Sequence, residues 1–290
     1  MITQSLPFLL WLSASTSTVI SHVNRDNIKP RLRIATDGGS FDYPGVGGPC
    51  KNEFGYVNFD YGNPFHKTQA DALHEAFCKG LGPLVGYGNE AIENSDRTVF
   101  SRYFTDDASD RSDVSEAFKL MIDVNNGNGP NDILWSMIVD KNDYMNLCQN
   151  RIAGYHDVDR VDKYEKLHFC DVTFEQPVLP SDIECGDLHD KPDVEMDNLA
   201  RIMLHEMLHN SQVGKFGPAR QITDCRNNEQ AVGILPPAHP CALINADSYA
   251  WLANNAYFKF ACTNAGHTPP NNGNFNDPDN YTPGIEETRG

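Results

Sequence analysis

The chain has 290 residues, which is enough for one large domain or two small lobes with a full hydrophobic core. Its 40 Asp and Glu residues outnumber its 23 Lys and Arg residues, so the formal net charge at pH 7 is −17. A surface of this sign repels nucleic-acid phosphates and anionic membranes, and we expect neither as a partner. It attracts basic substrates instead.

The N-terminal residues Leu6–Leu12 form a short apolar run that is followed by small residues. This pattern is typical of a secretory signal peptide, which we place at residues 1–20; the alternative is an N-terminal core segment. The eight cysteines are scattered, even in number and without a C-x-x-C pair. They predict up to four disulfides and an extracellular, oxidising location.

Residues 21–62 are rich in Gly, Pro and Asp, and we expect an irregular N-terminal segment there. Apolar residues at helical spacing predict a helix at residues 66–79, closed by Gly80, and a second helix at 114–122. A turn at residues 125–129 follows. Three β-type runs then predict short strands: residues 133–139, 151–155 and 166–172.

A longer helix is expected to begin at Asp193 or Asp197 as N-cap and to end near Gly214. Its apolar residues lie on most sides, so we expect this helix to be buried. A last helix is predicted at residues 243–260, before a polar tail at 263–290 that is expected to be disordered. Strands clustered between helices predict an α+β fold, mainly helical with a small sheet.

The expected buried helix carries the segment His205-Glu206-Met207-Leu208-His209. Two histidines four residues apart leave the same face of a helix, so both imidazoles can bind one ion. Glu206 lies beside them, where its carboxylate can accept a proton from water. This H-E-x-x-H arrangement predicts a Zn²⁺ site with Glu206 as general base. The alternative is a pair of hydrogen-bonded structural histidines.

Catalytic zinc takes three protein ligands and leaves a fourth position open, so a third ligand is needed. The metzincin pattern requires a histidine at position 215, where this chain has Lys215, and is excluded. A glutamate of the thermolysin-like type is available in Glu229, 20 residues after His209. An aspartate is available in Asp224, 15 residues after His209. Both alternatives remain open from the residues alone.

The H-E-M-L-H segment and the segment Asn245–Ala250 together resemble the deuterolysin-type (aspzincin) zinc metallopeptidases of fungi, including their lysine-specific metalloendopeptidase branch. The segment Lys166–Phe174 is similar to a short strand of that family that ends in a cysteine. The resemblance covers about residues 130–262. It implies a zincin-like fold for a metallopeptidase domain at residues 63–262, with the zinc site on a buried helix.

The resemblance also implies roles for individual residues. In that family a Gly-Thr-x-Asp segment after the zinc helix supplies the third ligand, and Asp224 is at the matching position. The family's tyrosine three residues past this ligand is Asn227 here. Its role in steadying the transition state is therefore lost or moved to Tyr249 or Tyr257.

Asp247 matches an acid that lines the substrate pocket in the lysine-specific members. A carboxylate there would pair with a substrate lysine; the alternative is that Asp247 caps the last helix. We therefore expect a secreted, monomeric zinc endopeptidase that cleaves peptide or protein substrates, including basic or lysine-containing ones. The alternative is a secreted zinc-binding or interaction protein whose peptidase site is degenerate and inactive.

Overall fold

The computed structural model describes eight stretches of the chain: residues 55–93, 98–125, 137–150, 152–158, 165–188, 194–216, 221–224 and 240–264. The expected signal peptide, the tail from residue 265 and Glu229 lie outside the described residues.

One mixed sheet is formed by four short strands in the order β1-β2-β4-β3. The strands are Gly55–Val57 (β1), Met137–Asp140 (β2), Gly154–Val158 (β3) and Glu165–Phe169 (β4). β1, β2 and β4 run parallel, and β3 pairs antiparallel with β4 at the edge. Side chains alternate along a strand, so His156 and its partner Leu167 share the face that also carries Glu165 and Gly154. Leu167 belongs to the main hydrophobic core, so this face is the inner one.

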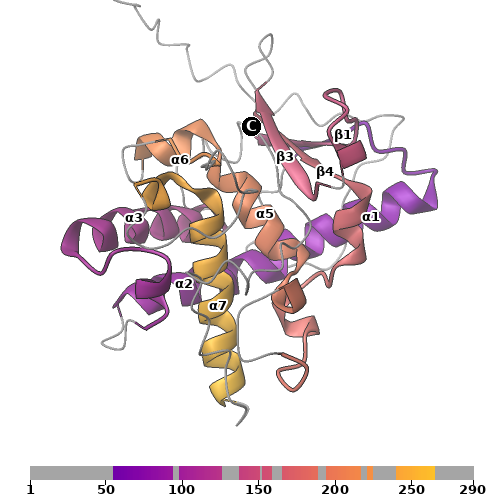
Figure 1. The fold of residues 1–290 in the computed structure, drawn as a ribbon. Helices are drawn as coiled ribbons and strands as arrows, with labels where there is room; N and C mark the ends of the chain where they lie inside the picture. Colours follow the sequence, from indigo (N-terminus) through magenta and orange to yellow (C-terminus); the bar gives the residue numbers. More distant parts are fainter. Residues whose placement is uncertain are drawn as a thin grey trace, which may run out of the picture. The chain divides into compact units, whose positions relative to one another are not determined.

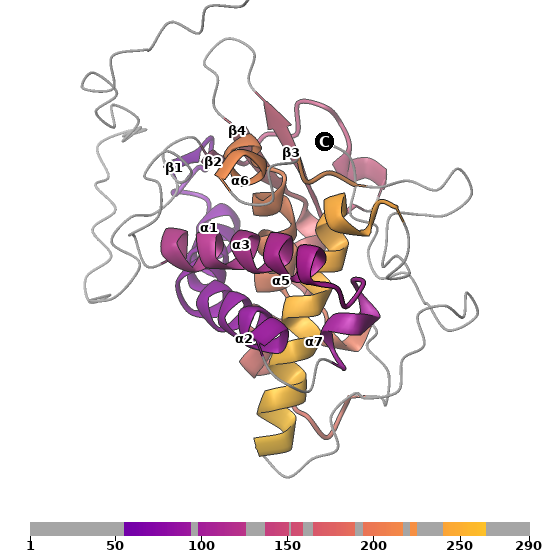
Figure 2. The same cartoon turned by 90° about the vertical axis from the view of Figure 1, so that its left-hand side faces the viewer.

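Helices provide most of the described structure. They are α1 (Pro64–Glu75), α2 (Gly82–Glu93), α3 (Ala108–Asn125), α5 (Leu199–Leu208), α6 (Ser211–Phe216) and α7 (Ala246–Asn264). Helix α5 contacts α7 and β3, and Figure 1 shows it between the sheet and α7. Helix α2 packs against both α3 and α7 (Figure 2). The α+β class, mainly helical with a small sheet, is confirmed.

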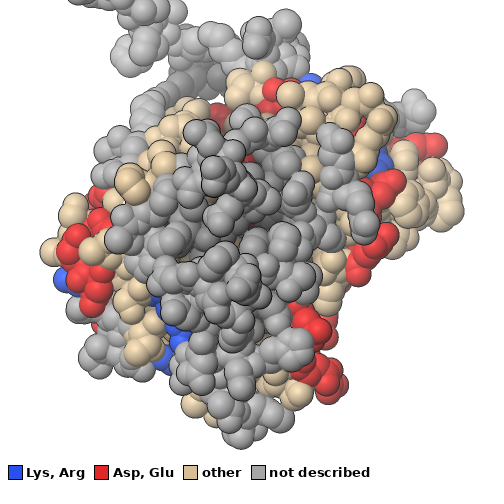
Figure 3. Space-filling model, in the orientation of Figure 1, with Lys and Arg blue, Asp and Glu red and all other residues tan. Residues whose placement is uncertain are grey.

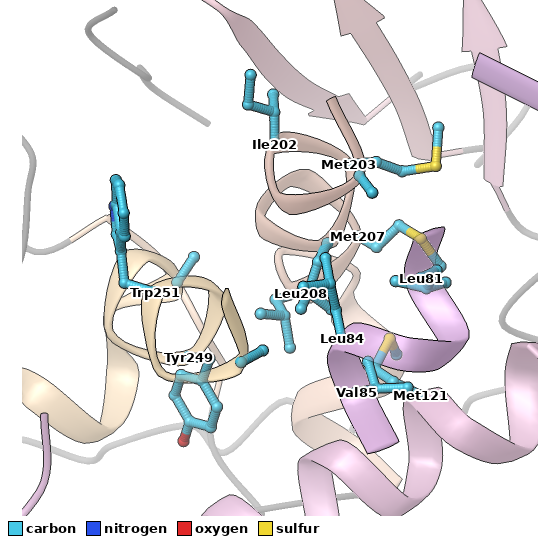
Figure 4. Packing of buried hydrophobic residues seen from close by; sticks show 14 of the residues in the cluster. Leu81, Leu84, Val85, Met121, Ile202, Met203, Met207, Leu208, Tyr249 and Trp251 are labelled. Carbon is cyan, nitrogen blue, oxygen red and sulfur yellow. The ribbon is translucent and has the colours of Figure 1, made fainter. Parts of the chain in front are cut away.

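Helix α5 is the centre of the core, because all ten of its residues are buried. Figure 4 shows Met207 and Leu208 of α5 facing Leu81 and Leu84, which lie just before and within α2. A helix that is apolar on most sides is stable only when other elements surround it. The expected burial of the motif helix is therefore confirmed.

The sequence suggested that Gly80 closes the first helix, but the helix continues past it. A π-helical segment, Ala76–Leu81, joins α1 directly to α2, so the chain stays helical as far as Glu93. A methyl group added at Gly80 would lie 2.4 Å from Cβ of Ala200 on α5. Gly80 is therefore needed for close packing between two helical segments, a requirement that sequence alone does not distinguish from a helix end.

Substituting Gly80 by alanine is expected to destabilise the protein by about 1–3 kcal/mol, because the added methyl overpacks the contact with α5. Gly86 is the matched control, since a methyl group added there meets nothing within 4 Å. Gly86→Ala is expected to stabilise the protein by about 0.5–1 kcal/mol through helix propensity. Denaturant unfolding of both variants checks the pair. Equal effects would contradict the close approach.

The start of the motif helix differs from the sequence expectation. Asn198, rather than Asp193 or Asp197, is the N-cap, and its side chain accepts a hydrogen bond from the Arg201 amide at 3.0 Å. Asp197 instead hydrogen-bonds the Arg201 guanidinium at 2.6 Å. The competing side-chain contact explains why the neighbouring Asn takes the capping role.

The end of this helix differs as well, because α5 ends at Leu208 rather than near Gly214. The side chain of Asn210 accepts a hydrogen bond from the Gln212 amide at 2.8 Å, and a new helix, α6, begins at Ser211. Local side-chain bonds of this kind compete with helical ones. His209 therefore lies at the C-cap of α5.

The expected irregular segment at residues 21–62 contains strand β1, which sequence reasoning missed. The other strands are displaced by a few residues from the expected ranges, and part of the run at 133–139 lies outside the described residues. Two disulfides are present among the described cysteines, Cys148–Cys170 and Cys185–Cys262. In the described part of the chain, no helix has both the length and the apolar character to cross a bilayer.

Candidate metal centre

Three side chains predicted as metal ligands converge in the structure. Nε2 of His205 lies 3.1 Å from Nε2 of His209, and Oδ1 of Asp224 lies 3.2 Å and 3.3 Å from these two nitrogens. All three residues are buried or nearly so. Among the described residues, this is the group of His, Cys, Asp and Glu side chains arranged to hold a metal ion.

The two histidines come from one stripe of α5, but Asp224 comes from a separate segment that the fold brings to them. Thr223 donates its amide to the Ile244 carbonyl at 2.7 Å and accepts from the Ala246 amide at 3.0 Å. This short parallel bridge joins residues 221–224 to the start of α7. It sets Asp224 opposite the histidines.

The electrostatics of the cluster favour an anionic third ligand. Burial by itself raises the pKa of Asp224, but attraction to His205 and the close contacts with both imidazoles lower that pKa well below its usual range. Asp224 is therefore an ionised carboxylate at neutral pH.

The donor set fits zinc. Two imidazole nitrogens and one carboxylate oxygen are typical zinc ligands, at bond lengths of ~2.0–2.2 Å. Ligand atoms at the corners of a tetrahedron with such bonds lie about 3.3 Å apart. The observed separations of 3.1–3.3 Å match this spacing.

Glu206, the predicted general base, is buried with 1% of its surface exposed. It follows His205 directly on α5, and its carboxylate lies against the edge strand β3. A methyl group added at Gly154 would lie 3.0 Å from Oε1 of Glu206 and 2.8 Å from the His168 carbonyl oxygen. Only glycine at this position of β3 lets the carboxylate approach the strand so closely.

Asp247, for which the resemblance implied a place in the substrate pocket, lies against His205. Its Oδ1 lies 2.9 Å from Nδ1 of His205, and only 3% of the residue is exposed. A carboxylate that accepts from Nδ1 places the proton there and leaves Nε2 for a metal. Asp247 thus contacts His205 from the first turn of α7, and its assignment to a substrate pocket stays a prediction.

The two tyrosines considered as replacements for the family's tyrosine lie elsewhere. Tyr249 is fully buried, packs edge-on against Phe104 and donates its hydroxyl to the Leu243 carbonyl at 2.8 Å. In Figure 4 it points away from α5. Tyr257 is ten residues further along α7 than Asp247, about 15 Å at helical rise, and stacks edge-on with Tyr87. Tyr249 is therefore part of the core, and its assignment to the substrate pocket stays a prediction. Asn227 and Glu229 lie outside the described residues.

Sequence reasoning missed a second polar group beside the metal centre. His156 of β3 has its ring centroid 6.0 Å from that of His209, and its Nε2 lies 2.8 Å from Oε2 of Glu165 on β4. Glu165 also accepts a hydrogen bond from the Ser211 amide at 3.0 Å and another from the Ser211 hydroxyl. The spacing of two residues in β4 could have indicated this group. Residues two apart in a strand lie on the same face, so Glu165 shares the inner face of the sheet with Leu167.

Glu165 links the sheet to the chain just after the second histidine. Burial tends to raise the pKa of Glu165, but hydrogen bonds from His156 and Ser211 outweigh it and lower the pKa below 4.5. A carboxyl group with a lowered native pKa stabilises the fold above its unfolded pKa, and this stabilisation is lost as the pH falls through the native pKa.

Glu165→Gln is accordingly expected to lower the free energy of unfolding by about 2 kcal/mol at pH 7, and by progressively less as the pH falls below about 4.5. Exposed Glu116 on α3 offers a control, since Glu116→Gln should change stability by less than about 0.5 kcal/mol. Denaturant unfolding at several pH values measures both. A loss for Glu165→Gln that does not change with pH would disagree with the ionised, hydrogen-bonded carboxylate.

No protein-family model matches the sequence, and no curated protein matches it. Among solved structures, a zinc peptidase from Grifola frondosa is similar at 15% sequence identity, with a TM-score of 0.40 over 65% of this chain and 95% of that chain. At this level the similarity identifies neither a family nor an activity.

Proposed function

We propose that the protein is a secreted zinc-dependent endopeptidase of zincin-like fold. The observation that carries the proposal is the convergence of His205, His209 and Asp224 at zinc-ligand spacing, with Glu206 on the same helix. A structural pair of histidines needs neither the buried carboxylate between the imidazoles nor a second buried carboxylate beside them.

The residues divide the chemistry between them. His205, His209 and Asp224 would hold the ion, and a bound zinc supplies Lewis acidity that acidifies water and polarises a carbonyl at neutral pH. Glu206 takes a proton from the attacking water and passes it to the leaving amine. Its burial against β3 keeps the carboxylate in a fixed position, which favours proton transfer to a peptide held nearby.

The edge strand β3 is the proposed place for the substrate backbone. An extended peptide adds readily to the edge of a sheet through main-chain hydrogen bonds. Because Gly154 touches Glu206, a peptide along β3 would have its backbone beside the general base.

Basic peptides are the proposed substrate class. On the face shown in Figure 3, acidic side chains of the described residues cover more of the surface than basic ones, in line with the net charge of −17. Such a surface raises the local concentration of cationic peptides. The proposal rests on this charge and not on Asp247, which is engaged by His205.

The deciding experiment is digestion of an unfolded, lysine-rich protein by the purified, zinc-loaded chain and by its Glu206→Gln variant. The proposal requires cleavage by the wild type alone. A wild type that holds zinc and cleaves nothing would support the alternative, a secreted zinc-binding protein with an inactive site.

A further inference from the structure

Arg201 has a charge that the proposed chemistry does not use. It is the largest fully buried side chain among the described residues, with 2% of its surface exposed. A guanidinium stays charged in proteins, and burying it costs several kcal/mol unless well-placed partners compensate. Arg201 also lies on α5 four residues before His205, so the two side chains leave the same face of the helix, one turn apart.

Asp197, Trp251 and Asp247 lie around the guanidinium. Its Nε lies 2.6 Å from Oδ1 of Asp197, and its Cζ lies 4.6 Å from the ring centroid of Trp251 on α7. On the side toward the metal centre, NH1 lies 3.7 Å from Oδ1 of Asp247. These contacts fix the guanidinium between α5 and α7.

The same oxygen of Asp247 is shared with the metal centre. Oδ1 lies 3.7 Å from the Arg201 guanidinium and 2.9 Å from Nδ1 of His205. One carboxylate oxygen therefore lies between a permanent cation and a metal-binding imidazole. A movement of this oxygen would turn the His205 ring and shift Nε2 relative to Asp224 and His209.

We propose that Arg201 is a positioning residue for the metal centre, which acts through Asp247 on the orientation and tautomer of His205. The inference rests on the proposed zinc site. The guanidinium, held by Asp197 and Trp251, keeps the Asp247 oxygen in place, and that oxygen keeps the proton of His205 on Nδ1. Outer partners of metal-bound histidines affect metal affinity by about 10–100-fold.

The test measures zinc affinity by competition with a chelator. It compares the wild type with Arg201→Met, with Asp247→Ala and with the variant that carries both substitutions. Arg201→Met is expected to weaken zinc binding about tenfold or more. Because Arg201 acts through Asp247, the double variant should bind zinc no more weakly than Asp247→Ala alone. Losses that multiply in the double variant, or unchanged affinity in Arg201→Met, would overturn the proposal.

Asn254→Ala is the matched control. Asn254 of α7 is also buried, but its side chain accepts a hydrogen bond from Asn198, the N-cap of α5, at 2.9 Å and donates one to the Met196 carbonyl, rather than bonding Asp247 or His205. This variant should lose stability while its zinc affinity stays within about twofold of the wild type. A loss of zinc affinity equal to that of Arg201→Met would show that Arg201 acts only through helix packing.

A readout without metal separates this inference from the proposed function. In metal-free protein labelled with ¹⁵N-histidine, the Nδ1–H signal of His205 should be protected from exchange by its hydrogen bond to Asp247, and Arg201→Met should weaken this protection. If Arg201→Met does not fold, Arg201→Lys can replace it. Lysine keeps the charge but lacks the planar guanidinium, so the effect on the His205 Nδ1–H signal should be intermediate. A wild type that binds no zinc ends the proposed function, whereas unchanged protection of the His205 Nδ1–H in a folded Arg201 variant ends this inference.

Discussion

Replacing Glu206 by glutamine is expected to lower kcat by about 10²–10⁴-fold while the zinc content stays at the wild-type level. The substitution conserves shape, so the amide fits the same buried position against Gly154 on β3. A neutral amide cannot accept a proton from water, and general-base catalysis is lost. Cleavage of a fluorogenic peptide and zinc determination on the same samples measure the two effects separately.

Two outcomes would contradict this expectation. Activity of the variant within tenfold of the wild type would mean that another group accepts the proton. Loss of zinc together with activity would mean that Glu206 supports the metal-binding geometry rather than the chemistry. Unfolding temperatures of the metal-free proteins serve as the control, since a folded variant is required for either conclusion.

Asp224→Ala is expected to weaken zinc binding by more than about 100-fold, because it removes one of three ligands and leaves two imidazoles alone. Glu229→Ala is expected to leave zinc affinity within about twofold of the wild type. The reason is structural: Asp224 already lies 3.2–3.3 Å from both imidazole nitrogens. Chelator competition with both purified variants gives the two affinities.

Zinc retained by Asp224→Ala and lost by Glu229→Ala would reverse the ligand assignment. Asp224→Asn refines the result, since it keeps one oxygen but removes the charge. It should bind zinc more tightly than Asp224→Ala and more weakly than the wild type. An affinity equal to that of the wild type would mean that the charge of Asp224 is unimportant for the metal.

The sequence predicted that His205, Glu206 and His209 lie together on one buried helix, because the relation between them is local. Spacing along one helix determines that His205 and His209 share a face, and no distant contact is needed for that conclusion. The same holds for the burial of α5 and for the α+β class, since apolar periodicity records which faces are covered.

Helix boundaries were predicted less well, because capping depends on which of several polar residues is already engaged. Asp197 was a reasonable candidate for the N-cap. In the structure its carboxylate bonds the Arg201 guanidinium instead, and Asn198 is the N-cap. Gly80 was interpreted as a helix end, although its purpose is close approach to Ala200 on α5, 120 positions later in the chain. The Gly80 error comes from a long-range contact that local patterns do not contain, whereas the Asp197 error comes from a choice between two neighbouring polar side chains.

By itself, the sequence determined a pair of histidines and a glutamate on a buried helix, and left two candidates for the third ligand. The tertiary structure determined where three acidic side chains lie, namely Asp224, Asp247 and Glu165. The bridge between Thr223 and Asn245 brings Asp224 to the imidazoles and places Asp247 behind His205. Glu165 of β4 lies beside the metal centre, where it contacts His156 and Ser211. Each of these positions depends on segments far apart in the chain, and only packing and hydrogen bonding between those segments determine which oxygen faces which nitrogen.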